Sequence, residues 1–193
     1  QTVAEEQGVT FKFNQPVNEI IVENKKATAV KTKTDTFHAD HVVVNADYAW
    51  AEMNLLDNKY QTYSDKYWDK RKIAPSAYLL YLDLDKQLDN FTHHNLYFHP
   101  EWEQHFDDIF KQPKWPDKFS YYVSCISKTD PSTAIDGGEN VFVLIPVAAG
   151  LKDTEKNRQF YFDKTIDHME KLAGENIKDH IVVKRIFAHN DFE

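Results

Sequence analysis

Four strongly apolar segments of strand length, all in the later part of the chain, constrain most what this sequence can fold into. They occupy residues 76–84, 119–126, 141–147 and 181–187. Each is too short for a buried helix and is bounded by polar or turn-forming residues, as β-strands are. Because strands this apolar need cover, we expect all four to lie in one mixed sheet flanked by helices.

Two helices of the later part are predicted by apolar side chains that recur every three or four residues. The first covers residues 101–110 and has three aromatic residues on one face: Trp102, Phe106 and Phe110. The second begins at Asp153 or Thr154 and ends at Gly174, since short polar residues cap helix starts and glycine favours helix ends. Its stripe contains Phe162, Ile166, Met169 and Leu172.

The early part is predicted to begin with a three-stranded antiparallel meander. Residues 9–13 alternate apolar and polar side chains, and residues 17–22 and 27–34 form two further runs of strand type. The tight polar connection Asn24-Lys25-Lys26 predicts that the last two pair as a hairpin.

A buried strand and a helix are expected next. After a short extended stretch at 36–39, residues 42–44 are continuously apolar, as in a parallel strand covered on both faces. Asp47 is a suitable N-cap for a helix over residues 48–56, and a short helix capped by Ser64 follows at 64–71. Regular patterns lapse between residues 56 and 63, where we expect the boundary between two segments.

Composition narrows the function classes. With 41% hydrophobic and 28% charged residues the chain is of the folded, water-soluble type, and its net charge of −8 argues against a nucleic-acid partner. A single cysteine, Cys125, cannot form an internal disulfide, which favours a reducing, cytoplasmic setting. No apolar run approaches the roughly 20 residues of a membrane helix. The first residue, Gln1, is not an initiator methionine, as in an excised segment.

No pattern in the sequence predicts a metal site or a nucleophile. His38 and His41 point to opposite sides of an extended segment, and the neighbours His93 and His94 are expected to point in different directions. We therefore expect no metal. Cys125 lies within an aromatic strand and is predicted to be a small buried hydrophobe.

Two ordered sets of motifs carry a resemblance to a known family. The early set, shared by many flavoproteins, comprises residues 8–11, 17–20, 26–30 and 39–47. The later, more specific set comprises residues 76–82, 93–98, 129–132, 143–147, 185–187 and 191–192. In this order and spacing the chain resembles an internal fragment of the bacterial-type carotenoid (phytoene) desaturases, which are FAD-dependent oxidoreductases.

The resemblance implies a mixed α/β fold that is part of a two-dinucleotide-fold flavoprotein. Residues 1–57 would be the middle segment of an FAD-binding domain and residues 58–193 a segment of the substrate-binding domain. The main chain of Val17 would pair with the adenine edge of FAD, and Asn45 and Ala46 would lie near its adenosine half. An ordinary strand residue explains Val17 equally well. The resemblance assigns no catalytic residue within the chain.

The implied substrate is a long hydrophobic polyene that loses a hydride to the flavin. One face of the later sheet would pack helices while the other meets this hydrocarbon. Such a substrate resides in a bilayer, so we expect the parent enzyme to dock peripherally on a membrane surface. An apolar wall exposed in the chain alone would promote oligomers.

The sequence also departs from the family. The glycine-rich phosphate loop and the glycine-rich segment that faces the flavin ring are absent, so we expect the chain alone to bind FAD poorly. Ile135 replaces a usual proline, and Ala188-His189 replaces Thr-Pro. The alternatives are a related flavoenzyme, such as a carotenoid isomerase, hydroxycarotenoid dehydrogenase or retinol saturase, and a flavin-free lipid-binding module.

Overall fold

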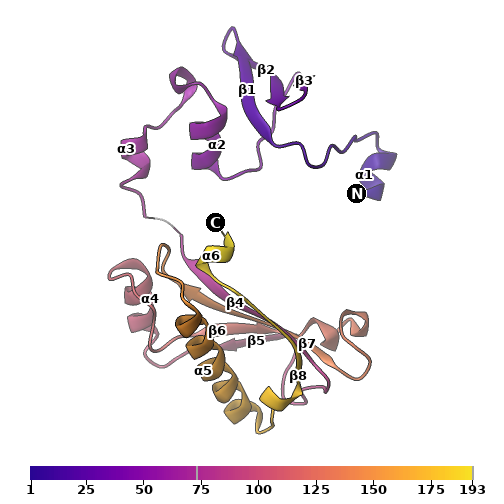
Figure 1. Cartoon of the computed structure of the whole chain (residues 1–193), viewed down its shortest axis with the longest axis vertical. Helices are drawn as coiled ribbons and strands as arrows, with labels where there is room; N and C mark the ends of the chain where they lie inside the picture. The colour runs from indigo at the N-terminus through magenta and orange to yellow at the C-terminus, as the bar shows by residue number, and fades with distance from the viewer. Residues whose placement is uncertain (73, 193) are drawn as a thin grey trace. The chain divides into compact units, whose positions relative to one another are not determined.

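The computed structural model describes residues 1–72 and 74–192. The chain divides into two compact units, Gln1–Arg71 and Lys72–Glu193 (Figure 1). The division follows Arg71, further along the chain than the expected boundary between residues 56 and 63. Each unit has a hydrophobic cluster of its own.

The first unit contains a three-stranded antiparallel sheet in the order β1–β2–β3. Its strands are β1 (Val17–Glu23), β2 (Lys26–Thr32) and β3 (Thr36–His38). Asn24 and Lys25 both have positive φ, +49° and +64°, as the two central residues of a type I′ hairpin turn require. The predicted hairpin and the antiparallel meander are therefore confirmed, with β3 as the third strand.

One helix packs on this sheet. The side chain of Asp47 accepts a hydrogen bond of 2.8 Å from the main-chain N–H of Trp50 and so caps α2 (Tyr48–Leu55), as predicted. Ala51 and Leu55 of α2 form a small core with Ile20 of β1. The unit's other elements are α1 (Thr2–Glu6), η1 (Asn58–Tyr60) and α3 (Asp65–Trp68), the last of these shorter than the predicted helix over 64–71.

Two strand predictions in this unit, for residues 9–13 and 42–44, are wrong. Residues 9–13 form no strand, and the rings of Phe11 and Phe13 instead stack at 5.8 Å. Residues 42–44 form none either, and Val43 is 92% exposed. An apolar run becomes a buried parallel strand only where neighbouring strands pair with it, and the described residues of this unit supply no such neighbour to it.

The second unit is built on one five-stranded sheet in the order β5–β6–β7–β4–β8. This confirms that the four apolar segments share a sheet. Every pair of neighbours is antiparallel, so the expected mixed sheet is corrected to an antiparallel one. The strands are β4 (Ser76–Leu84), β5 (His94–Tyr97), β6 (Tyr121–Ser124), β7 (Glu139–Val147) and β8 (Ile181–Phe187).

One face of this sheet forms the core with α5 (Glu155–Ala173), which runs along it in Figure 1. Thr154 caps α5 by accepting from the N–H of Asn157 at 3.2 Å, and Gly174 ends it with φ +69°, as predicted. The buried face of β4 and β7 presents alternate residues to the helix: Tyr78, Leu80, Leu82, Leu84, Val141, Val143 and Ile145. Shorter elements complete the unit: α4 (Trp102–Phe110), η2 (Ile126–Lys128), η3 (Pro131–Thr133), η4 (Lys178–His180) and α6 (His189–Phe192).

Three of the four residues of the predicted α5 stripe pack in the core. Phe162, Ile166 and Met169 are buried in the core, whereas Leu172 is 57% exposed. A helix has 3.6 residues per turn, and the fourth position of this stripe has turned out of the contact.

We expect Ile166→Ala to destabilise the chain by about 2–5 kcal/mol, because it opens a cavity in a fully buried site. The matched control is Leu172→Ala on the same helix, for which we expect a change within about 0.5 kcal/mol. Urea unfolding followed by circular dichroism measures both. Equal losses for the two variants would contradict the packing of α5.

Candidate functional site

The second face of the five-stranded sheet carries a row of aromatic side chains. Tyr122, Phe142, Tyr81 and Phe187 come from β6, β7, β4 and β8, and Phe192 of α6 extends the row. Successive ring centroids lie 6.3, 5.2, 6.1 and 5.8 Å apart. The row forms because side chains alternate between the two faces along each strand, while residues opposite one another on neighbouring strands, such as Tyr81 and Phe142, share a face. It crosses the sheet and leaves Tyr81 43% exposed.

An apolar groove lies beside this row, between α4 and strands β5 to β7. Its volume is about 780 Å³, within the range of about 300–1,000 Å³ typical of small-molecule sites. Most of its wall is hydrocarbon or aromatic: Leu96, Phe98, Trp102, Phe106, Ile109, Phe110, Leu144 and Pro146. Such a wall suits a ligand without hydrogen-bonding groups.

The predicted face of α4 supplies one side of the groove. Trp102, Phe106 and Phe110 lie on one side of the helix and are 50%, 53% and 38% exposed. On the neighbouring face of α4, His105 and Ile109 are buried and also line the groove. The sequence identified the aromatic stripe, but the groove depends on strands distant in sequence.

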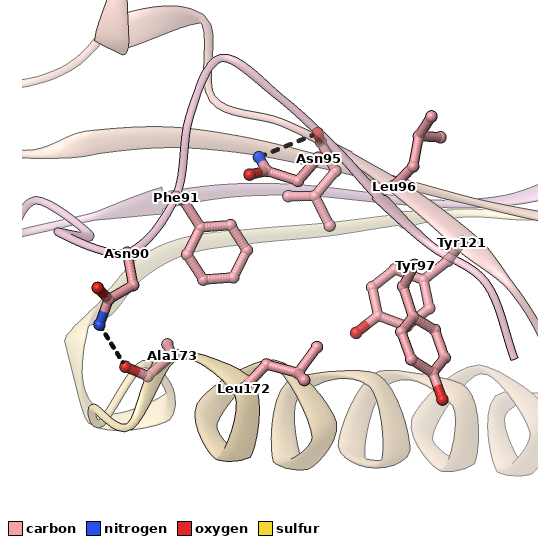
Figure 2. A pocket seen from close by; sticks show the side chains of 9 residues that line it. Asn90, Phe91, Asn95, Leu96, Tyr97, Tyr121, Leu172 and Ala173 are labelled. Atoms are coloured by element: carbon pink, nitrogen blue, oxygen red, sulfur yellow. Dashed lines mark hydrogen bonds between the residues drawn. The ribbon is translucent and has the colours of Figure 1, made fainter.

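A second, smaller cavity lies on the α5 side of the sheet (Figure 2). Its volume is about 270 Å³, and Tyr97 and Tyr121 point into it while Leu96 points away, as successive strand residues do. Asn90 donates to the carbonyl of Ala173 at 2.7 Å. The cavity is too small for a long ligand, and the side-chain amide of Asn90 at its edge is already hydrogen-bonded to the main chain. We therefore interpret the cavity as a feature of packing.

The residues expected to contact a flavin lie in the first unit. Val17 begins β1, is half-buried and is paired with Thr32, with an irregularity in register after it. Because β1 is the outer strand of its sheet, one side of its main chain is available to an adenine edge. Asn45 and Ala46 are exposed and directly precede the cap of α2. The side-chain amide of Asn45 is polar, whereas Ala46 can offer only its main chain to a polar contact near the helix start.

His94, the first residue of β5, and the preceding His93 depart from the expected arrangement. The rings of His93 and His94 do not diverge but lie 4.1 Å apart. Each Nδ1 is bonded to a hydroxyl, that of Thr129 at 2.7 Å and that of Tyr122 at 2.6 Å. Tyr122 lies on the neighbouring strand β6 and Thr129 in the segment after it, and these two hydrogen bonds orient the rings. Within residues 1–72 and 74–192, no three metal-binding side chains cluster.

Cys125 is fully buried, as predicted. Burial, aided by the nearby carboxylate of Glu139, raises the pKa of its thiol to about 12. A thiol with so high a pKa is not ionised near neutral pH and does not act as a nucleophile.

In the part of the chain that the structure describes, no helix has the length and apolar character needed to cross a membrane.

Comparison with known proteins identifies the type of flavoprotein. A family model described as flavin containing amine oxidoreductase matches residues 1–192. Carotenoid 3,4-desaturase of Haloarcula japonica is 42% identical over 98% of this chain and 38% of that protein. The zeta-carotene-forming phytoene desaturase of Myxococcus xanthus is 34% identical over 76% of this chain and 28% of that protein.

Similarity in structure agrees with the sequence matches. An oxidoreductase from Methanosarcina mazei aligns with a TM-score of 0.63 over 97% of this chain and 40% of that one, at 16% identity. This likeness bears on the fold alone. The chain spans about two fifths or less of the length of these relatives.

Proposed function

The chain belongs to the flavin-containing amine oxidoreductases, and from that premise we propose that it is part of an FAD-dependent carotenoid desaturase. Residues 1–57 are assigned to its FAD-binding domain and residues 58–193 to its substrate-binding domain. The single observation that carries the proposal is the aromatic row beside the apolar groove of about 780 Å³. Relatives named as carotenoid desaturases match both units.

The proposed ligand of the groove and row is a long conjugated hydrocarbon. A polyene offers no hydrogen bonds, so its affinity comes from apolar burial at about 25 cal/mol per Å². Tyr81, Phe142 and Tyr122 present flat ring surfaces that pack well on a conjugated chain. These residues orient the polyene and exclude water from it.

When bound, FAD would supply the redox chemistry, in which an allylic carbon of the polyene gives up a hydride and a neighbouring carbon loses a proton. The role of this chain is to hold the cofactor's adenosine half, with the main chain of Val17 on the adenine edge and Asn45 and Ala46 close by. The outer position of β1 and the exposed segment before α2 support these contacts. We assign no side chain of the described residues as the base that accepts the proton lost by the polyene.

A carotenoid oxygenation is the second candidate reaction. The 4,4'-diaponeurosporene oxygenase of Staphylococcus aureus is 27% identical over the whole of this chain. The same groove would hold a polyene for either reaction, so the products distinguish them. A desaturase adds double bonds to the polyene, whereas an oxygenase adds oxygen to it.

We expect the 193-residue chain to bind FAD weakly, with a Kd above about 100 μM. It has no glycine-rich loop at a helix start to hold the pyrophosphate, the strongest anchor of such cofactors. Titration of FAD followed by flavin fluorescence measures this, with the full-length gene product, which we expect to bind FAD, as the positive control. Stoichiometric binding at low micromolar concentration would show that the cofactor contacts are misplaced.

In the full-length gene product, Phe142→Ala should lower kcat/KM for the carotenoid about 30-fold. The change removes about 2 kcal/mol of apolar contact with the polyene. Leu172→Ala, on the opposite side of the sheet, is the control that should leave turnover unchanged. Product formation is followed by chromatography and absorbance. Unaltered turnover by a folded Phe142→Ala enzyme would exclude this sheet face as the substrate wall.

We also propose that α4 touches a membrane surface from which the polyene enters. Its exposed Trp102 and Phe106, with Phe98 at 70% exposed, are the type of side chains that enter the bilayer interface. Replacing Trp102 and Phe106 together with serine should reduce co-flotation of the full-length gene product with liposomes at least tenfold. Phe160→Ser, which removes an aromatic of similar exposure from α5, is the matched control. Equal flotation of both variants would contradict this role of α4.

A further inference from the structure

One imidazole fastens α4 to the sheet. His105 projects from the buried side of α4 and is 2% exposed. Its Nε2 lies 2.8 Å from the main-chain carbonyl of Pro146 in β7, and its Nδ1 accepts from the main-chain N–H of Ser120 at 3.2 Å. A single side chain thus joins the helix to β7 and to the residue that leads into β6. Pro146 and Ser120 also line the groove.

These two partners determine the protonation state of the ring. An N–H group can only donate, so Nδ1 must offer its lone pair to Ser120. A carbonyl can only accept, so Nε2 must carry the proton that it donates to Pro146. The docked position therefore requires neutral imidazole in the Nε2–H form. A second proton, on Nδ1, would point at the N–H of Ser120 and remove that bond.

We propose that His105 is a positioning residue that holds α4 on the sheet only while its ring is neutral, so that acid releases this wall of the groove. The inference concerns the groove whose ligand is assigned under the proposed function. It does not depend on which polyene occupies the groove or on the flavin.

The surroundings of His105 favour the neutral form. Burial lowers the pKa of His105 below its usual 6.5, against a smaller opposing effect of the hydrogen bond to Pro146 and the carboxylate of Asp108. His99, the other titratable side chain that acts on it, lowers the pKa further. The phenols Tyr121 and Tyr122 of β6 bond to other histidines.

The direction of the pH effect follows from this lowered pKa. When α4 is released, His105 regains its usual pKa near 6.5 and takes up a proton below that pH, while the docked ring stays neutral. Docking is therefore at full strength above about pH 6.5 and weakens as the pH falls below it, by up to about tenfold per pH unit.

Hydrogen exchange in the full-length gene product tests the inference. Exchange of the amides of Trp102–Phe110, corrected for the intrinsic pH dependence, is measured between about pH 7.5 and 5. We expect constant protection above about pH 6.5 and a progressive loss below it, of up to about tenfold per pH unit. His105→Gln should remove this acid loss, because the side-chain amide also offers a donor group (NH2) and an acceptor (C=O) but does not titrate.

The matched control is His168→Gln, because burial also lowers the pKa of His168, which lies on α5. This variant should keep the acid loss in α4. Flat protection in the wild type, or an acid loss that persists in a protected His105→Gln variant, overturns the inference. If His105→Gln is unprotected at every pH, ¹⁵N spectra of histidine-labelled wild type decide. A ring neutral as Nε2–H while α4 is protected supports the role, and a ring charged while α4 stays protected refutes it.

These readouts involve neither turnover nor cofactor. A failed desaturation assay would leave the hydrogen-exchange result standing, and a flat exchange profile would leave the proposed reaction untouched. The two failures are therefore distinguishable.

Discussion

The antiparallel pairing of β4 with β7 is the constraint on which the second unit depends. The two strands pair over nine residues each, from Ser76 opposite Val147 to Leu84 opposite Glu139. Because successive residues alternate between faces, this one ladder fixes which side chains meet α5 and which remain on the other side. Both the stability of the unit and the geometry of its candidate site follow from the same register.

The two faces use apolar side chains for different purposes. On the α5 face, residues such as Leu80 and Val143 are fully buried and interdigitate with the helix. On the other face, Tyr81 and Phe142 keep part of their ring surfaces accessible. A one-residue slip between β4 and β7 would exchange these roles and disrupt core and ligand wall together. The site is therefore protected by the same interactions that hold the fold.

Local pattern predicted the elements of this unit well, because each strand and helix cap depends on near neighbours in sequence. The limits of β4, the cap at Thr154 and the end at Gly174 are examples. In the first unit, by contrast, the predicted strand at residues 42–44 is absent, because an apolar run becomes a strand only where other strands pair with it. The sequence predicts that one face of the sheet meets a hydrocarbon, but not that α4 forms the other side of the groove, because Phe106, Leu96 and Leu144 adjoin only after three elements assemble. The double hydrogen bond of His105 leaves no periodic signal at all.

The order of strands in the sheet also sets the order of events during synthesis. The central strand β4 pairs with β7 and β8, and β7 begins only at Glu139 and β8 at Ile181. As the chain leaves the ribosome, β4 therefore emerges long before either of its partners exists. Contacts so distant in sequence form slowly because long loops must close first. An unpaired, largely apolar strand in that interval is a natural target for a chaperone.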